Sequence, residues 1–264
     1  MYSIERKAEI LKFLEQNGKV EVNALAEQFD TSRETIRRDL KDLETQGALT
    51  RTHGGAVSVK FQNVHTDAAI HEFPLAVRGI QNFDLKQEIC KTAVSYIQDG
   101  DTIFVDNSST TMYLIQFLPK DLHVTFITNS IKFLAEASQF DCTHKLFICL
   151  GGMYNPKNLS TYDSAASLSG SEYYPDKCFI SCAGISKERM LTDTSIHEIN
   201  TKKHMIDTAR EVYLLADHTK FSYNGQFFLA DFDRVDHIIT DSQADPSSYS
   251  FLEDTGIHII SAID

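Results

Sequence analysis

The sequence contains no tryptophan, and it has only five prolines and five cysteines among 264 residues. An odd number of cysteines without a CxxC pair argues against a disulfide framework and against a cysteine zinc site. Four of the five lie in or beside apolar runs, so we expect buried, reduced thiols at positions 90, 142, 149, 178 and 182. There is no HExxH motif, and the seven-residue spacing of His197 and His204 is typical of an incidental pair, so neither a metal nor a cofactor is expected.

Long apolar runs are missing as well. Runs such as residues 103–105 and 146–150 fall far short of the roughly 18 residues needed to cross a bilayer. Residues 1–15 alternate charged and apolar side chains and lack the apolar region of a secretory signal, so we expect a cytoplasmic protein. The 42% apolar and 23% charged residues are ordinary globular values, and the length allows one large domain or two smaller ones. Fibres, disulfide-stapled scaffolds and disordered tails are excluded.

A basic excess, the usual footprint of a DNA-binding protein, is absent from the chain as a whole, whose net charge is −12. The acidity is uneven, however. Residues 1–57 hold nine Lys and Arg and ten Asp and Glu, a net of −1, so the rest of the chain carries −11. Because phosphate binding depends on where the cations stand locally, the first part of the chain can still bind DNA if its basic residues share one face.

Residues 1–57 have the pattern of a winged helix-turn-helix domain. Apolar residues at helical spacing predict a helix over residues 4–16, a second one over residues 23–29 and a third that begins after Asp30. The third helix ends at Gly47. Residues 48–57 then predict a strand, a Gly-Gly turn and a returning strand.

The third helix carries the basic face that DNA binding requires. Its N-cap is Thr31 or Ser32, with Glu34 in capping-box position relative to Thr31. An inward apolar stripe is formed by Ile36, Leu40 and Leu43. On another side of the helix, basic residues recur at i, i+4 and i+8, namely Arg33, Arg37 and Lys41, with Thr35 and Arg38 beside them.

Such a helix would lie in the major groove of DNA. Arg33 and Arg37 would donate to guanine, whereas Arg38, Lys41 and the hairpin residue Arg51 would meet phosphates. Helix spacing alone leaves open a solvated helix in a small three-helix domain, because acidic residues partly cancel the positive charge at Glu34, Asp39, Asp42 and Glu44.

The stretch from Arg6 to Val57 contains Ser32-Arg33-Glu34-Thr35-Ile36-Arg37-Arg38-Asp39-Leu40, then Leu43-Glu44, Gly47 and Arg51-Thr52-His53-Gly54-Gly55-Ala56. Without a gap, it closely resembles the DNA-binding head of the DeoR family of bacterial transcriptional regulators. The resemblance implies that the third helix is the recognition helix. It assigns DNA binding to Ser32, Arg33, Glu34, Thr35, Arg37, Arg38, Lys41, Arg51, His53 and Gly54.

The rest of the chain predicts a linker and an α/β domain. Residues 58–80 are polar, lack a sustained period and include Pro74, so they predict a linker into a domain over residues 81–264. After a helix that starts near residue 82, strands alternate with helices. Strands are predicted over residues 102–106, 124–128, 145–150, 178–183, 211–216, 235–240 and 257–261, with helices over 110–118, 130–138 and 197–209. This alternation predicts a mostly parallel sheet.

Polar loops follow several of these strands, at the sheet edge where ligands bind in such folds. The run Asp106-Asn107-Ser108-Ser109-Thr110-Thr111 opens a helix, whose free N–H groups favour an anion such as phosphate. The alternative is a hydroxyl-rich N-cap without a ligand. A pocket is favoured because other polar or glycine-rich loops are expected at the same sheet edge, namely Thr128-Asn129-Ser130, Gly151-Gly152, Ala183-Gly184 and Asp217-His218-Thr219-Lys220.

These loops are followed or accompanied along the chain, in a fixed order, by Gly184-Ile185-Ser186, Glu198, Lys202, Met205, Leu215-Ala216-Asp217, Lys220-Phe221 and residues 236–241. In this order they resemble the DeoR-family sensor domain, whose fold is similar to ribose-5-phosphate isomerase. The two resemblances together cover nearly the whole chain. They imply an effector site for a phosphorylated sugar or a related metabolite. Its residues would be Asp106, Ser108, Ser109, Thr110, Thr111, Asn129, Gly151, Gly152, Gly184, Lys202 and Lys220.

Within this implied site, the hydroxyl run from Ser108 would hold the phosphate, Asn129 and Gly152 would line the pocket, and Lys220 would approach the anion. The chain departs from the family pattern at two positions. Ser108 stands where glycine is common, which bears on the freedom of the loop backbone. Ala183 stands where an acidic residue is frequent and cannot move a proton, which argues against catalysis.

Glu198 and Lys202 stand four residues apart on a predicted helix. They would either contact the effector or form a surface ion pair.

We therefore predict a transcriptional regulator, most simply a repressor of a carbohydrate catabolic operon. Its partners would be double-stranded operator DNA, a phosphorylated sugar and at least one further copy of itself. One alternative is a sugar-phosphate isomerase or deaminase with an appended DNA-binding head. Another is a constitutive DNA-binding protein with a vestigial pocket, which Ser108 leaves open.

Overall fold

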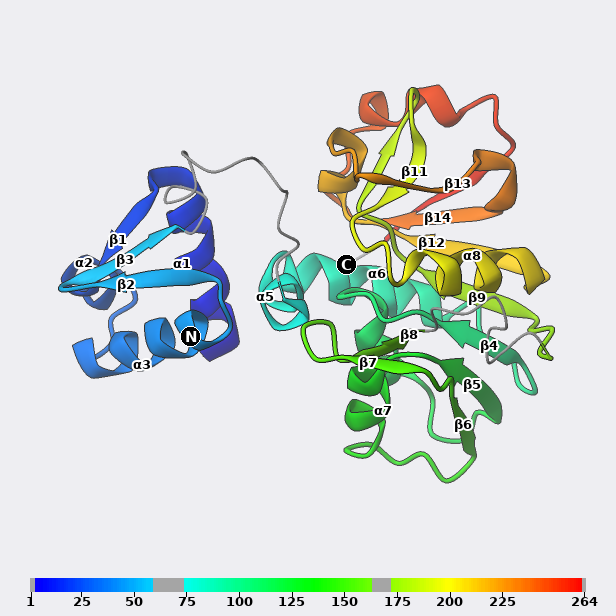
Figure 1. Ribbon diagram of the computed structural model, residues 1–264, viewed down its shortest axis with the longest axis horizontal. Coiled ribbons are helices and arrows are strands. Elements are labelled where there is room, and N and C mark those ends of the chain that lie inside the picture. Colours follow the sequence, from blue (N-terminus) through cyan, green and yellow to red (C-terminus); the bar gives the residue numbers. More distant parts are fainter. Residues whose placement is uncertain (1–2, 59–73, 163–171, 263–264) are drawn as a thin grey trace. The chain divides into compact units, whose positions relative to one another are not determined.

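The computed structural model describes residues 3–58, 74–162 and 172–262 (Figure 1). The chain divides into two compact units, Met1–Phe83 and Asp84–Asp264. No helix in the described ranges is long and apolar enough to cross a membrane. Each unit has an apolar core of its own.

The first unit is a winged helix-turn-helix domain, as predicted. Its helices are α1 (Ser3–Asn17), α2 (Val22–Gln28) and α3 (Arg33–Thr45). Its antiparallel sheet has the order β1-β3-β2, with β1 (Lys19–Glu21), β2 (Leu49–Thr52) and β3 (Gly55–Ser58). The three helices pack their apolar stripes together with the sheet, through residues that include Ile10, Leu14, Leu25, Ile36, Leu40 and Leu43.

Two contacts fix the geometry of this domain. Arg6 of α1 pairs with Asp39 of α3 at 2.5 Å, and both side chains are buried, so the pair holds α1 against α3. Gly55 starts β3 where the backbone of β1 passes so closely that a Cβ would lie 1.8 Å from the carbonyl oxygen of Val20. Glycine is therefore required at the base of the β2–β3 hairpin.

The predicted linker is not irregular throughout. Residues 59–73 lie outside the described residues, but Leu75–Ile80 form the helix α5, whose Val77 and Ile80 join the apolar core of the first unit. A helix of six residues is too short to produce a recognisable period in the sequence, which is why the pattern did not indicate it.

The second unit is built on a parallel sheet of seven strands in the order β15-β14-β12-β9-β4-β5-β6. The strands are β4 (Thr102–Val105), β5 (Val124–Thr128), β6 (Lys145–Cys149), β9 (Lys177–Ile180), β12 (Glu211–Leu215), β14 (His237–Thr240) and β15 (His258–Ser261). Six of the seven begin and end within two residues of the predicted strands, and β9 ends three residues before its predicted end. The α/β class with a parallel sheet is confirmed.

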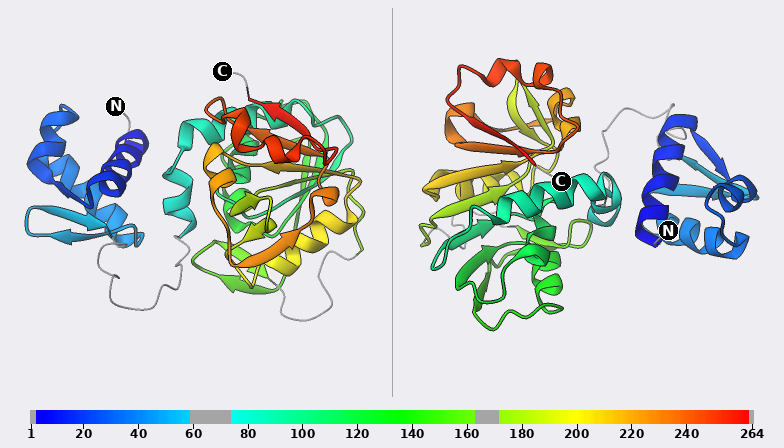
Figure 2. Two further views of the ribbon diagram at one scale, coloured as in Figure 1. Left: turned by 90° about the horizontal axis from the view of Figure 1, so that it is seen from above. Right: turned by 180° about the vertical axis from the view of Figure 1, so that it is seen from behind.

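Helices cover both faces of this sheet (Figure 2). On one face α8 (Ile199–Thr208) packs Met205 and Ile206 into a core with Phe104. The other face carries α6 (Phe83–Val94), and just beyond its end Tyr96 packs on Tyr213 of β12, with ring centroids 5.5 Å apart. The remaining helices of the sheet layer are η1 (Thr111–Phe117), a 3-10 helix where an ordinary helix was predicted, and α7 (Ile131–Ala137).

The sequence pattern did not predict two antiparallel additions. One is the hairpin of β7 (Met153–Asn155) and β8 (Ser160–Tyr162). The other is a small sheet of β10 (Gly184–Ser186), β11 (Met190–Asp193) and β13 (Phe227–Ala230). Four short 3-10 turns complete the described part of the unit, namely η2 (His218–Ser222), η3 (Phe232–Arg234), η4 (Pro246–Ser248) and η5 (Ser250–Leu252).

The five thiols are free, but they are not all buried as predicted. Cys90, Cys178 and Cys182 are buried, Cys142 is half-buried and Cys149 is exposed. Cys149 ends β6, which forms an edge of the sheet, so an apolar run in the sequence does not bury its thiol there.

Candidate functional site

The basic face of α3 is exposed. Of the ten residues assigned to DNA binding, Thr35 is half-buried and the other nine are exposed. Ser32 is the N-cap of α3, because its hydroxyl accepts a hydrogen bond from the Thr35 amide at 3.1 Å. The predicted capping box between Thr31 and Glu34 is therefore wrong. Glu34 instead pairs with Arg37 at 3.3 Å on the exposed side of the helix.

Two of the four acidic residues that weakened the basic face are engaged by α1. Asp39 points inward to Arg6, and Asp42 pairs with Lys7 at 2.7 Å. The hydrogen bond from Lys7 is the main cause that lowers the pKa of Asp42 below its ordinary value. The acidic residues of α3 thus cancel less of its exposed positive charge than their number suggests.

The β2–β3 hairpin carries Arg51, His53 and Gly54 in exposed positions. Glu44, near the end of α3, accepts a hydrogen bond from the Arg51 amide at 2.9 Å and lies 3.8 Å from its guanidinium group. The hairpin is thereby fixed to the basic helix. Together α3 and the hairpin form one exposed surface with the geometry of a winged-helix DNA interface.

A second site lies where the strand order of the large sheet reverses. From β4 the chain moves through β5 to β6, whereas from β9 it moves through β12 and β14 to β15. A crevice outside the carboxyl ends of such neighbouring strands is where open α/β sheets bind ligands. In this chain the switch point lies between β4 and β9, and the loops that follow these two strands meet there.

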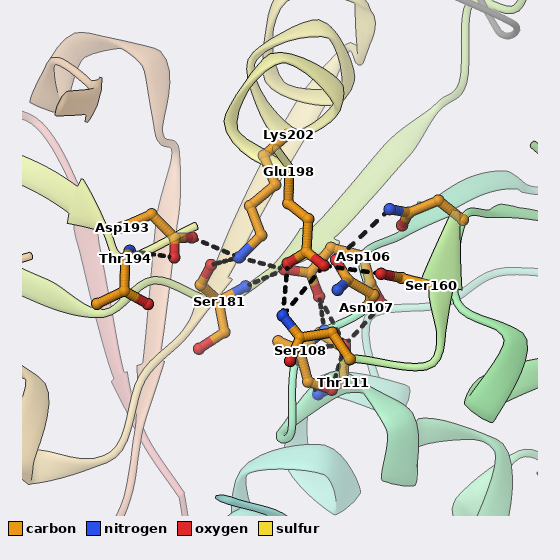
Figure 3. A network of polar contacts seen from close by, with 12 residues as sticks. Asp106, Asn107, Ser108, Thr111, Ser160, Ser181, Asp193, Thr194, Glu198 and Lys202 are labelled. Atoms are coloured by element: carbon orange, nitrogen blue, oxygen red, sulfur yellow. Dashed lines mark hydrogen bonds and ion pairs between the residues drawn. The ribbon is translucent and has the colours of Figure 1, made fainter. Parts of the chain in front are cut away.

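Asp106 holds these two loops together (Figure 3). One of its carboxylate oxygens accepts hydrogen bonds from the Ser108 amide at 3.1 Å and from the Thr111 hydroxyl at 2.6 Å. The other accepts one from the Ser181 amide, after β9, at 3.0 Å. Asp106 is fully buried, and it fixes the loops after β4 and β9 relative to each other.

Lys202 reaches the same two loops from α8. Its ammonium group lies 2.6 Å from Asp193 and 3.2 Å from Asp106, and it donates to the Ser181 carbonyl at 3.0 Å. Burial alone would lower the pKa of Lys202, but the charges of Asp193 and Asp106 outweigh it and raise the pKa above its ordinary value. The ammonium group therefore donates two hydrogen bonds within the protein and is neutralised by two carboxylates.

Glu198, one turn earlier, holds the β7–β8 hairpin. Its carboxylate accepts hydrogen bonds from Ser160 at 2.7 Å, from Asn158 at 3.1 Å and from Asn155 at 3.3 Å. Figure 3 shows Glu198 and Lys202 entering the cluster side by side from the same helix. Both are buried, so the alternative of a surface ion pair is wrong.

The loop after β4 offers unused hydrogen-bond donors. Residues 106–111 are all less than a tenth exposed. Within the described ranges, the amides of Asn107, Ser109 and Thr110 and the hydroxyls of Ser109 and Thr110 donate to no protein acceptor. Ser108 does not take a positive φ, so serine fits here without backbone strain.

Asn129, which follows β5, faces the same loop. Its amide nitrogen donates to the Thr161 carbonyl at 3.0 Å and lies 3.5 Å from the Asn107 side-chain oxygen. Its own side-chain oxygen is buried and accepts no hydrogen bond among the residues that the structure describes. A buried polar atom of this kind indicates a partner from outside the chain.

The remaining residues assigned to the effector occupy different positions. Gly151 and Gly152 are exposed after β6, and Gly152 has a φ of +128°. Gly184 starts β10, where a Cβ would lie 1.9 Å from the Tyr223 carbonyl, so packing alone explains this glycine. Lys220 is half-exposed in η2, and its charge acts on Asp217. The sequence pattern missed Asp193 and Ser160, because their partners lie 9 and 38 residues away.

These features define a transcriptional regulator that joins a DNA-binding head to a small-molecule sensor domain. The model of the DeoR-like helix-turn-helix domain matches residues 6–62, and the model of the DeoR C-terminal sensor domain matches residues 81–242. The chain therefore belongs to the DeoR family, which confirms the resemblance found in the sequence. This places it among transcriptional regulators and not among enzymes.

Two relatives match along nearly their whole length. The chain is 33% identical over 259 residues to the uncharacterized HTH-type transcriptional regulator YulB of Bacillus subtilis (strain 168), covering 98% of this chain and 96% of that protein. It is 31% identical over 265 residues to the HTH-type transcriptional repressor GlcR of the same organism, with coverages of 98% and 96%. Ribose 5-phosphate isomerase A from Methanocaldococcus jannaschii is 21% identical, with a TM-score of 0.39 over 53% of this chain and 55% of that one, and this likeness is partial.

Proposed function

We propose that this protein is a cytoplasmic repressor of a carbohydrate catabolic operon, with an operator affinity controlled by a phosphorylated sugar bound between β4 and β9. The observation that carries the effector is the loop after β4, whose buried amides at Asn107, Ser109 and Thr110 have no acceptor in the described protein. Buried N–H groups are almost always paired in proteins, so this loop is suited to an anion such as phosphate.

The DNA-binding half of the proposal rests on the exposed face of α3 and the hairpin beside it. Operators read by such heads consist of two half-sites, so we propose that the protein acts as a dimer or a larger homo-oligomer. The relative GlcR is named a repressor, which supports repression and not activation by this protein.

Two measurements test this proposal together. Selection from random duplexes would first supply an operator, and electrophoretic mobility shifts would then follow its binding in the presence of a panel of phosphorylated sugars. Thermal denaturation with the same panel and with the unphosphorylated sugars would report binding directly. We expect one phosphorylated compound to raise the melting temperature and to change operator affinity, while its unphosphorylated form does neither.

Failure would take distinct forms. A protein that binds the operator but responds to no compound would be a constitutive DNA-binding protein with a vestigial pocket. A protein that selects no duplex would contradict the DNA-binding assignment itself.

A further inference from the structure

One edge of the large sheet is open. The strand β6 ends the sheet on its side and pairs only with β5 in the described part of the chain (Figure 1). The amide of Leu150, just after β6, donates to the Thr128 carbonyl of β5. Because backbone groups alternate along a strand, those of Phe147 and Cys149 are directed away from β5. These outward groups form no hydrogen bond with any described residue.

The same edge is apolar. Residues 146–149 carry no charge, and Leu146 is 59% exposed. An open apolar edge pairs readily with other strands, so proteins protect such edges with lysines, prolines, bulges or a covering element. The charged residue of β6, Lys145, does not protect it. Its ammonium group donates instead to the carbonyl oxygens of Pro119 and Lys120, at 2.8 and 3.0 Å.

Two other edge strands differ from β6 in this respect. In the small sheet, the pairing of β13 with β11 contains a register shift, and Lys203 lies 5.1 Å from the ring centroid of the exposed Phe228. Irregular pairing and a lysine are features that blunt an edge. At the other end of the large sheet, both isoleucines of β15 are half-buried. The edge of β6 is therefore the least protected of the three.

The backbone of β6 is complementary to a second copy of itself. Antiparallel pairing about a two-fold axis brings the outward groups of one strand against those of the other. With the axis at Phe147, its amide and carbonyl exchange hydrogen bonds with the partner's Phe147. The Cys149 amide then donates to the carbonyl of the partner's Lys145. The ladder ends there, because the Lys145 amide already donates to the Cys142 carbonyl at 3.0 Å.

This register also covers the exposed leucine. Leu146 comes to lie opposite the partner's Ile148, on the same face of the joined sheet. The other face of β6 is already fixed, because Phe147 packs on Phe126 and Phe133 with ring centroids 5.7 and 6.3 Å apart. The strand is therefore held in place before a partner arrives, and pairing costs little ordering of its own side chains.

We propose that β6 pairs with β6 of a second copy of the chain, antiparallel and centred on Phe147, so that the two seven-stranded sheets become continuous. This inference rests on the homo-oligomer of the proposed function and names the surface that forms it. The contact uses backbone groups and Leu146. The thiol of Cys149 points to a face of the sheet and not into the ladder, because side chains stand out of the plane of a sheet.

A crosslink that depends on the register tests this pairing in the full-length protein. Lys145→Cys would face the native Cys149 of the partner subunit at a Cα separation of roughly 5.5 Å, which a disulfide can span. Within one chain the two positions lie roughly 13 Å apart along the strand and cannot be joined. Oxidised glutathione should therefore produce a covalent dimer on a denaturing gel, and a reducing agent should remove it.

Two controls separate the register from mere exposure of a thiol. Lys145→Cys combined with Cys149→Ser lacks the second thiol and should form no such dimer. Thr143→Cys places an exposed thiol two positions out of register, so it should crosslink far less than Lys145→Cys.

A second measurement needs no new thiol. Leu146→Glu changes an exposed residue, so folding should be preserved, but it removes apolar burial from both copies. It also places two carboxylates at diagonal positions about 7 to 8 Å apart. We expect sedimentation velocity to show a dissociation constant of the assembly that is raised by roughly 100-fold. Phe228→Glu makes a similar change on the edge strand β13 and should assemble as the wild type does.

The outcomes separate the two proposals. Crosslinking that persists after Cys149→Ser, or unchanged assembly of Leu146→Glu, would overturn the pairing of β6 and leave the proposed homo-oligomer, which would then use another surface. Wild type that stays monomeric at all concentrations would overturn both the pairing and the homo-oligomer. The proposed control of operator binding by a phosphorylated sugar is tested separately, by the mobility shifts and melting temperatures described above.

Discussion

At the scale of single residues, the exposed side chains of α3 differ in how firmly the protein itself holds them. Arg37 is exposed but is paired with Glu34 at 3.3 Å, and such exposed pairs contribute little to stability. The guanidinium group can therefore leave Glu34 for DNA at small cost. Ser32, by contrast, is bound to the Thr35 amide and hydroxyl, so its first role is to start the helix.

Arg37→Ala should weaken operator binding by about 1 to 3 kcal/mol if Arg37 reads a base, because a bidentate contact to guanine is worth that much. The loss should concern the selected operator far more than a scrambled duplex, and fluorescence anisotropy with both duplexes measures the difference. Arg210→Ala removes an exposed guanidinium group from the second unit and serves as the control. Equal losses on both duplexes would assign Arg37 to phosphate instead, and unchanged binding would contradict the recognition-helix assignment.

Sequence patterns predicted correctly which side of α3 is exposed. The exposed face of α3 follows from helical periodicity, which fixes the side of the helix on which Arg33, Arg37 and Lys41 stand. The partners of Lys202 and Glu198 do not follow from it, because tertiary folding brings Asp193 and Ser160 to them from other elements. A surface ion pair between Glu198 and Lys202 would require both side chains to be exposed, but both are buried.

At the scale of elements, the loop from β12 into η2 depends on the charge of Asp217. Its pKa is lowered in the folded protein, so the folded state binds this proton less readily than the unfolded chain does. The resulting stabilisation is present above the unfolded value of about 3.9 and is lost as the pH falls through the lower folded value.

We therefore expect the difference in unfolding free energy between wild type and Asp217→Asn to shrink as the pH is lowered from 6 to 3. Urea denaturation at a series of pH values measures it. If the two unfolding free energies differ by a constant amount from pH 6 to pH 3, Asp217 has the same pKa in the folded and the unfolded state.

The β7–β8 hairpin depends on Glu198 in a similar way. Its carboxylate binds three side chains of the hairpin, two of which are buried. Glu198→Ala leaves these donors without their acceptor, so backbone amides of residues 153–162 should exchange with deuterium faster than in wild type. Lys157→Ala, an exposed change in the same hairpin, should leave exchange as it is. Unaltered exchange in Glu198→Ala would show that the other contacts of the hairpin suffice.

Periodicity predicted the parallel strands well, because buried strands with apolar runs and helices between them leave a strong signal. It missed the β7–β8 hairpin and the β10-β11-β13 sheet, whose strands have only three or four residues. It also predicted an ordinary helix where η1 is a 3-10 helix. Short elements are fixed by tertiary contacts and leave too little pattern to recognise.

At the scale of the whole molecule, regulation is a coupling between two binding events. If the effector changes operator affinity by some factor, the operator must change effector affinity by the same factor. Couplings of this kind typically amount to about 5- to 150-fold.

Titrating the identified effector with and without saturating operator duplex should yield equal factors from both directions. Calorimetry measures the factor by which the operator changes effector affinity, and anisotropy measures the factor by which the effector changes operator affinity. A scrambled duplex at the same concentration controls for general electrostatic effects. Unequal factors would show that a further equilibrium, such as a change of oligomer, accompanies binding.

The sequence indicates two parts, because the helix and hairpin pattern of residues 1–57 gives way, after residue 81, to strands that alternate with helices. Two family models match these parts, over residues 6–62 and 81–242. The end of the first unit was not predictable in detail, since α5 joins its core through two apolar side chains only.

The open edge of β6 also makes the molecule suitable for selective labelling. Three of the five thiols are buried, and burial raises the pKa of Cys182 to about 12. Cys149 alone is exposed, and burial raises its pKa too, so it would need a mildly alkaline buffer to react with a maleimide dye. It ends the strand next to β5, whose loop carries Asn129. A fluorophore attached there would report from beside the Asn129 loop without any engineered cysteine.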